Sequence, residues 1–74
     1  MNTGIKNKLK TLIGENVGLF FGSDNGIIHI TFPSDRQLYK IERIEGEDCI
    51  VLSDNEYETF LSIDHISYVS IKKK

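Results

Sequence analysis

The chain has 74 residues, among them nine Lys and Arg and eleven Asp and Glu, for a formal net charge of −2. This length predicts a single domain over residues 1–74, near the lower limit for a core without disulfides or metals, and a hydrophobic fraction of 39% is typical of a folded chain. The single cysteine excludes an intrachain disulfide, and no apolar run is long enough to span a membrane. We therefore expect a cytoplasmic protein whose overall charge does not favour bulk attraction to nucleic acid.

The charges are unevenly placed along the chain. Residues 1–10 carry three lysines and no acid, and the chain ends in Lys72, Lys73 and Lys74. Acidic residues dominate between Glu42 and Asp64. Two basic ends around an acidic middle predict a surface that is polarised in sign.

The first predicted element is a short amphipathic helix over about residues 3–13. Thr3 is a suitable N-cap, and Gly14 can end the helix. Four apolar residues have the spacing of one helical face: Ile5, Leu9, Leu12 and Ile13. Because so short a helix is stable only when this face is packed, we expect it to cover one open end of a barrel.

The rest of the chain, about residues 16–72, has the pattern of short strands joined by tight turns. Period-two alternation and β-branched or aromatic residues predict strands over 17–22, 27–32, 38–44, 49–52, 57–63 and 66–71. The Asn25-Gly26 pair predicts a hairpin turn between the first two. Gly46-Glu47-Asp48 predicts a tight turn, and the fully apolar run over 49–52 that follows it predicts a strand buried on both faces. The apolar phase slips between Ile41 and Ile44, which predicts a bulge or a sharp bend near Glu42 and Arg43. Short strands with a strong bend are typical of a small barrel.

Three segments resemble the Sm-like family, which includes the LSm proteins and bacterial Hfq. Leu12-Ile13-Gly14-Glu15-Asn16-Val17 is similar to the family's entry into its first strand. The segment from Ile44 to Leu52 is similar to the end of the first family motif, with Glu45 at an Asp position and Cys49 at an Asn position. The segment from Ile63 to Val69 is similar to the second motif.

The resemblance implies a mainly β fold, in which an N-terminal helix precedes a strongly bent, antiparallel, five-stranded Sm-like (SH3-like) barrel. The segment from about Ser23 to Asp35 would be an extra hairpin. It also implies a non-enzymatic RNA-binding or RNA-associated protein that forms a homo-oligomeric ring. In the family the last two strands pair between neighbouring subunits, which here would be Tyr57–Ile63 and Tyr68–Ile71. A subunit this small with two open edges also has an independent physical motive to oligomerise.

In the RNA-binding members of the family, an Asn and an Arg from the two motifs hold and stack a base at the inner rim of the ring. Cys49 and Asp64 stand at the corresponding places here. A thiol lacks the paired donor and acceptor of an amide, and carboxylates repeated by symmetry would repel phosphates. A structural ring or protein-interaction adaptor without RNA binding is therefore an alternative function, and a monomeric SH3-like adaptor is a third.

The candidate nucleic-acid contacts are Lys6, Lys8, Lys10 and His65. In a ring, the lysines would either form a basic face that contacts single-stranded RNA in a salt-sensitive manner or form a solvated face that keeps the assembly soluble. His65, in a turn, would either stack a base or be an exposed turn residue. Several strand aromatics would offer stacking surfaces or, more often, core or subunit contacts: Phe20, Tyr39, Tyr57, Phe60 and Tyr68.

The remaining chemistry-bearing residues predict no catalytic or metal site. His29 is expected to face solvent from a strand, and no third His or nearby Cys gives zinc-ligand spacing. Cys49, beside an apolar strand and without a basic neighbour, is expected to be a small buried core thiol. The sequence has no nucleophile elbow and no phosphate-binding glycine loop, so we expect neither enzymatic activity nor a cofactor.

Overall fold

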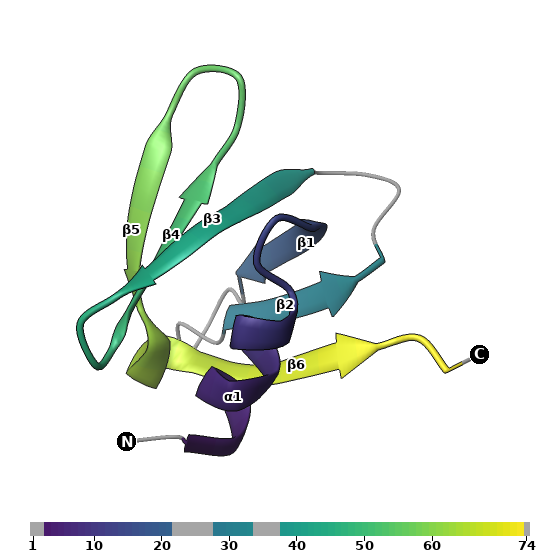
Figure 1. The fold of residues 1–74 in the computed structure, drawn as a ribbon. Helices are drawn as coiled ribbons and strands as arrows, with labels where there is room; N and C mark the ends of the chain where they lie inside the picture. The colour runs from purple at the N-terminus through teal and green to yellow at the C-terminus, as the bar shows by residue number, and fades with distance from the viewer. Residues whose placement is uncertain (1–2, 22–27, 34–37, 74) are drawn as a thin grey trace.

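The computed structural model describes residues 3–21, 28–33 and 38–73, in which one helix precedes a sheet (Figure 1). The elements in chain order are α1 (Thr3–Thr11), β1 (Asn16–Phe21), β2 (Ile28–Phe32), β3 (Tyr39–Glu45), β4 (Cys49–Ser53), β5 (Glu58–Ser62), the 3-10 helix η1 (Ile63–His65) and β6 (Ile66–Ile71). The expected Asn25-Gly26 turn lies outside the described residues. Within the described ranges, no helix is both long enough and apolar enough to cross a membrane.

The described strands form one six-stranded sheet in the order β5-β4-β3-β1-β2-β6. Every neighbouring pair is antiparallel except β2 and β6, which are parallel. A mainly β fold with an N-terminal helix is therefore confirmed. The closed, five-stranded antiparallel barrel is not confirmed, because β5 and β6 are the two ends of the sheet and do not pair with each other. Within the segment expected as an extra hairpin, about Ser23 to Asp35, the described residues include β2, an interior strand that is antiparallel to β1 and lies between β1 and β6.

Helix α1 packs against the sheet beside β6 (Figure 1). Leu9 on the helix and Leu12 in the following turn are buried. Gly14 ends this segment with a φ of +89°, and its N–H donates to the carbonyl oxygen of Ile41 at 2.7 Å. Ile13 differs from the expectation: the helix has already ended, and the Ile13 side chain is 46% exposed. The packed stripe of the helix is therefore shorter than its apolar sequence pattern.

The predicted bulge is present in β3. The register with β4 shifts between Ile41 and Arg43, so Glu42 is the extra residue. The Ser53 hydroxyl on β4 donates to the Glu42 carboxylate at 2.5 Å. As a result Ile41 and Ile44 both pack toward the core although they are three residues apart.

The core is a single cluster of aliphatic side chains on one face of the sheet, which we call the core face; the opposite face is the outward face. Its members are Leu9, Leu12, Val17, Leu19, Ile28, Ile30, Ile41, Ile50, Leu52, Ile63 and Ile66. Val51 is fully buried as well, but it alternates with Ile50 and Leu52 and lies on the outward face. The prediction that this strand is buried on both faces is therefore confirmed.

Candidate functional site

Among the described residues, β5 and β6 are the two end strands of the sheet, and the outer side of each is unpaired. Both carry exposed apolar side chains: Phe60 on β5 is 54% exposed and Tyr68 on β6 is 49% exposed. Tyr57, just before β5, and Ile71, at the end of β6, are exposed as well. An edge strand with exposed apolar side chains is a ready template for pairing with another chain. These two edges are therefore the first candidate interaction surfaces.

Three rings stand side by side on the outward face of β1, β2 and β6. Phe20, His29 and Tyr68 are opposite one another in register. The His29 and Tyr68 rings are stacked with centroids 4.1 Å apart, and Phe20 lies tilted at 6.0 Å from His29. A 3.1 Å hydrogen bond between His29 Nε2 and Ser70 Oγ also fixes the imidazole. We call Phe20, His29 and Tyr68 the aromatic column.

The column ends at the β6 edge. Among the described residues, no other ring contacts the face of Tyr68 that is turned away from His29. His29 lies on the outward face as expected, but it is half-buried between two rings instead of facing solvent. Its stacking depends on which residues lie opposite it in β1 and β6, and local alternation in β2 does not contain that information.

A second apolar contact lies on the outward face of β3, β4 and β5. Arg43, Val51 and Phe60 are opposite one another in register, and the guanidinium carbon of Arg43 is 5.9 Å from the Phe60 ring centre. Arg43 also pairs with Glu45 at 2.7 Å and with Glu58 at 3.6 Å, and the hydrogen bond to Glu45 raises the pKa of Arg43. Val51 is thus covered from both sides, and Phe60 is positioned at the β5 edge.

Charge divides the fold into two parts. The elements α1, β1, β2 and β6 contain no Asp or Glu, although the exposed Glu15 lies in the turn between α1 and β1. Lys6, Lys8 and Lys10 lie on α1, and Lys72 and Lys73 follow β6. We call this part the basic half. The elements β3, β4, β5 and η1 with their turns form the acidic half, which carries Glu42, Glu45, Glu47, Asp48, Asp54, Glu56, Glu58 and Asp64. The polarity predicted from the sequence is present in the fold, and each half contains one free edge.

The three lysines of α1 do not form one patch within a subunit. A helix turns about 100° per residue, so Lys6 and Lys10 lie on one flank of the buried stripe and Lys8 lies about 160° away on the other flank. Lys6 is half-buried, and Lys8 and Lys10 are exposed. Any phosphate contact by a single helix therefore involves either the Lys6–Lys10 pair or Lys8.

The structure places His65 beside acidic side chains. The Ile63 N–H donates to the Asp48 carbonyl oxygen at 2.6 Å, which brings η1 against the β3–β4 turn, where Gly46 has a φ of +63°. His65 is exposed in η1 and directly follows Asp64. The two turns that the family motifs would place together are thus neighbours, and their charge is negative.

Cys49 differs from the expectation of a buried core thiol. It is only partly buried and lies on the outward face of β4, opposite Ser62. The alternation of the strand gives the core face to Ile50 and Leu52, and Cys49 therefore stays outside the core cluster.

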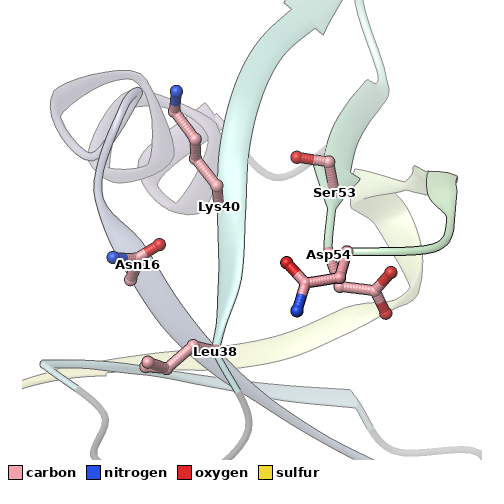
Figure 2. Close-up of a pocket in the computed structure, with 6 residues that line it drawn as sticks. Asn16, Leu38, Lys40, Ser53 and Asp54 are labelled. Carbon is pink, nitrogen blue, oxygen red and sulfur yellow. The ribbon is translucent and has the colours of Figure 1, made fainter.

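A hollow of about 440 Å³ lies between β1, β3 and the β4–β5 turn (Figure 2). Its lining residues are Asn16, Leu38, Lys40, Ser53, Asp54 and Asn55. The Asp54 carboxylate accepts the N–H groups of Tyr57 at 2.7 Å and Glu56 at 2.8 Å, and these bonds, that of Tyr57 first, lower the pKa of Asp54. Asp54 therefore holds the turn, and the hollow offers a ligand only one cation, Lys40, which extends away from Asp54.

Comparison of the chain with models of known protein families, with curated proteins and with solved structures finds no significant match. The features of the chain that bear on its function are therefore the two edges, the aromatic column and the charge pattern.

Proposed function

We propose that the chain is a non-enzymatic, Sm-like module that assembles into a homo-oligomeric ring and associates with single-stranded RNA. The observation that carries the proposal is the division of the sheet into a basic half and an acidic half, each ending in a free edge. Opposite charge on the two edges favours pairing of β5 in one copy with β6 in the next. Pairing of β5 with β5 would instead bring two acidic halves together.

The strand directions determine how such pairing would run. β5 and β6 point the same way across the sheet, because β5 is related to β2 by four antiparallel steps and β6 is parallel to β2. A copy that continues the sheet with the same face outward therefore adds its β5 to β6 as a parallel strand. This contact is head to tail, and such contacts form a ring when the rotation between subunits closes.

The basic half supports the association with RNA. The lysines of α1, together with Lys72 and Lys73, would give each subunit a phosphate-attracting region without a competing carboxylate in α1, β1, β2 or β6. A ring would repeat this region by symmetry, so that weak single contacts add up along one strand of RNA. His65 remains the proposed stacking residue near the acidic turns.

Light scattering coupled to size-exclusion chromatography tests the assembly. We expect a single oligomer larger than a dimer at micromolar protein concentration. A monomer at that concentration would rule out the ring and favour the SH3-like adaptor.

Fluorescence anisotropy of labelled oligo-U and oligo-A, at low and moderate salt, tests RNA association. For single-stranded RNA, each phosphate that the protein neutralises contributes about 0.7 to the steepness of log affinity against log salt. We expect a lower affinity for RNA and a shallower salt dependence in the double variant Lys6→Ala, Lys10→Ala, in Lys8→Ala, or in both. Lys40→Ala, which lies in the acidic half, is the matched control. Unchanged affinity and salt dependence in the triple Lys6, Lys8, Lys10 variant would refute the helix lysines as contacts.

A second candidate function is a ring or protein-interaction adaptor that does not bind RNA. The acidic side chains around the β3–β4 turn and η1 favour it, since the resemblance puts Cys49 and Asp64 where RNA-binding members of the family hold a base. An oligomer that binds neither oligonucleotide at low salt would establish this alternative over the first.

A further inference from the structure

The free edges of β5 and β6 match each other best in one register. Both strands have an outward face and a core face, and directly opposite residues of a continuous sheet must share a face. We infer that, in the proposed head-to-tail assembly on which this inference rests, β5 residues 60–62 lie against residues 68–70 of β6 in the next copy, beyond the irregularity at Ser67 that puts Ile66 and Tyr68 on opposite faces. Phe60 then lies beside Tyr68 of the next copy.

On the outward face this register continues the aromatic column across the subunit boundary. Phe60 is exposed at the β5 edge and is positioned by Arg43 on its own sheet. Tyr68 has one ring face on His29 and its other face toward the β6 edge. Phe60 of one copy therefore contacts the open side of Tyr68 in the next, and an aromatic pair of this kind adds attraction beyond simple burial. Ser62 lies beside Ser70 in the same register.

On the core face the same register brings together Leu61 and Val69. Each is partly buried and packs at the margin of its own core cluster. Side by side, they would cover each other's exposed portion and join the two cores at the boundary. The register thus places apolar side chains together on both faces of the sheet.

Neighbouring registers lose these matches. A shift by one residue would place outward side chains opposite core-facing ones. A shift by two residues in one direction places Glu58 beside Tyr68 and Phe60 beside Ser70, which pairs an acid with a ring and a ring with a hydroxyl. A shift by two in the other direction places Phe60 beside Ile66, a buried core residue.

The charges beyond the strand ends agree with the inferred register. Lys72 directly follows β6, and Asp64 lies in η1 directly after β5, so parallel pairing of the two strands brings these opposite charges of neighbouring copies to the same end of the contact. Both side chains are exposed in the subunit. This contact also predicts that assembly weakens as salt screens the pair.

Cysteine cross-linking tests the register directly. In a Cys49→Ser background, which removes the native thiol, Ser62→Cys and Ser70→Cys are made in separate chains. Neighbouring strands lie about 4.8 Å apart, within the Cα separation that a disulfide accepts. We expect interchain disulfides under mild oxidation only when the two variants are mixed. Ser62→Cys mixed with Ser67→Cys is the isosteric control, since these positions are displaced along the strands by about 10 Å in this register.

The possible results distinguish failure of the inferred register from failure of the proposed assembly. A monomer in light scattering refutes the assembly and the register together. An oligomer that gives no Ser62–Ser70 cross-link, or an equal Ser62–Ser67 cross-link, refutes the register and leaves the assembly standing. Cross-linking of either single variant alone shows two-fold pairing of like edges and overturns the head-to-tail contact.

A truncation pair tests the continued column. Phe60→Ala should raise the protein concentration needed for assembly by about tenfold or more, because it removes a central aromatic of the contact. Phe20→Ala, at the far end of the column and 41% exposed, should leave that concentration unchanged. Equal effects of the two variants would refute the contact between Phe60 and Tyr68, and circular dichroism of both confirms that each is folded.

Discussion

Replacing Leu9 with Ala tests whether α1 closes the core. The Leu9 side chain is fully inaccessible to solvent and belongs to the core cluster, although the helix has only nine residues. Removing three buried carbons costs about 2.4 kcal/mol in transfer free energy at about 0.8 kcal/mol per methylene, and the cavity brings the cost to about 3 kcal/mol or more. A chain of this length has a free energy of unfolding of about 4–11 kcal/mol, so the variant should lose a large share of its stability.

Thermal unfolding followed by circular dichroism measures this loss. A cost of about 3 kcal/mol corresponds to a decrease in Tm of about 12–24 °C for a domain of this size. Ile13→Ala is the matched control, because the Ile13 side chain is 46% exposed and its truncation should cost less than about 0.5 kcal/mol. Protein concentration must be equal in all samples, since assembly adds to apparent stability. Equal decreases in Tm for the two variants would refute the docking of α1 through Leu9.

Asp54→Ala should lower Tm more than Asp54→Asn, because Asn keeps an acceptor for the two turn N–H groups. The folded state lowers the pKa of Asp54, so the carboxylate stabilises the fold fully above its ordinary pKa of 3.8, and this stabilisation is lost as pH falls through the folded-state pKa. The difference in Tm between wild type and Asp54→Ala should therefore shrink as the solution is acidified. Gly46→Ala should lower the free energy of unfolding in urea by about 1 kcal/mol, and Gly46→Asn should lower it less. The reason is that a Cβ added at φ +63° meets no atom within 4 Å, so only the backbone conformation is penalised. A larger loss for Gly46→Ala would indicate a steric clash instead. Deleting Glu42 should leave the far-ultraviolet circular dichroism spectrum intact, because Ile41 and Ile44 then share the core face of a regular strand. The deletion should also straighten β3 and change the subunit number measured by light scattering. An unfolded variant would contradict this account of the bulge.

The sequence predicted local features well where one segment contains the whole signal. The slip in apolar phase located the β3 bulge, because Ile41 and Ile44 can share a face only if one residue is extra. Gly14 and Gly46 occupy the positive-φ positions that end the helix segment and turn β3 into β4. The continuous apolar run of β4 indicated burial on both faces, which Val51 confirms.

Features that depend on distant segments could not be predicted in this way. The alternation of β2 is the same whether its neighbours are parallel or antiparallel, so the pairing of Ile30 with Val69 has no local signal. The stacking of His29 depends on that pairing. The family resemblance also predicts five strands with an added hairpin, although β2 is an interior strand that joins β1 to β6. The lysines of α1 were expected as one group, yet the helical period separates Lys8 from the other two.

The parallel pairing of β2 with β6 has a consequence for how the chain reaches its folded state. β3, β4 and β5 are joined by short turns and close small loops, whereas β6 must return to a strand formed near the start of the chain. Loops of that length are entropically costlier to close, and such distant contacts slow folding. We expect β6 to dock after the meander of β3, β4 and β5 has formed, which pulsed hydrogen exchange would reveal as later protection of β6 amides. Since Tyr68 arrives with β6, the aromatic column and the acceptor edge for another copy are completed only in this last step. A partly folded chain would therefore expose β5 before it could offer β6 to a neighbour.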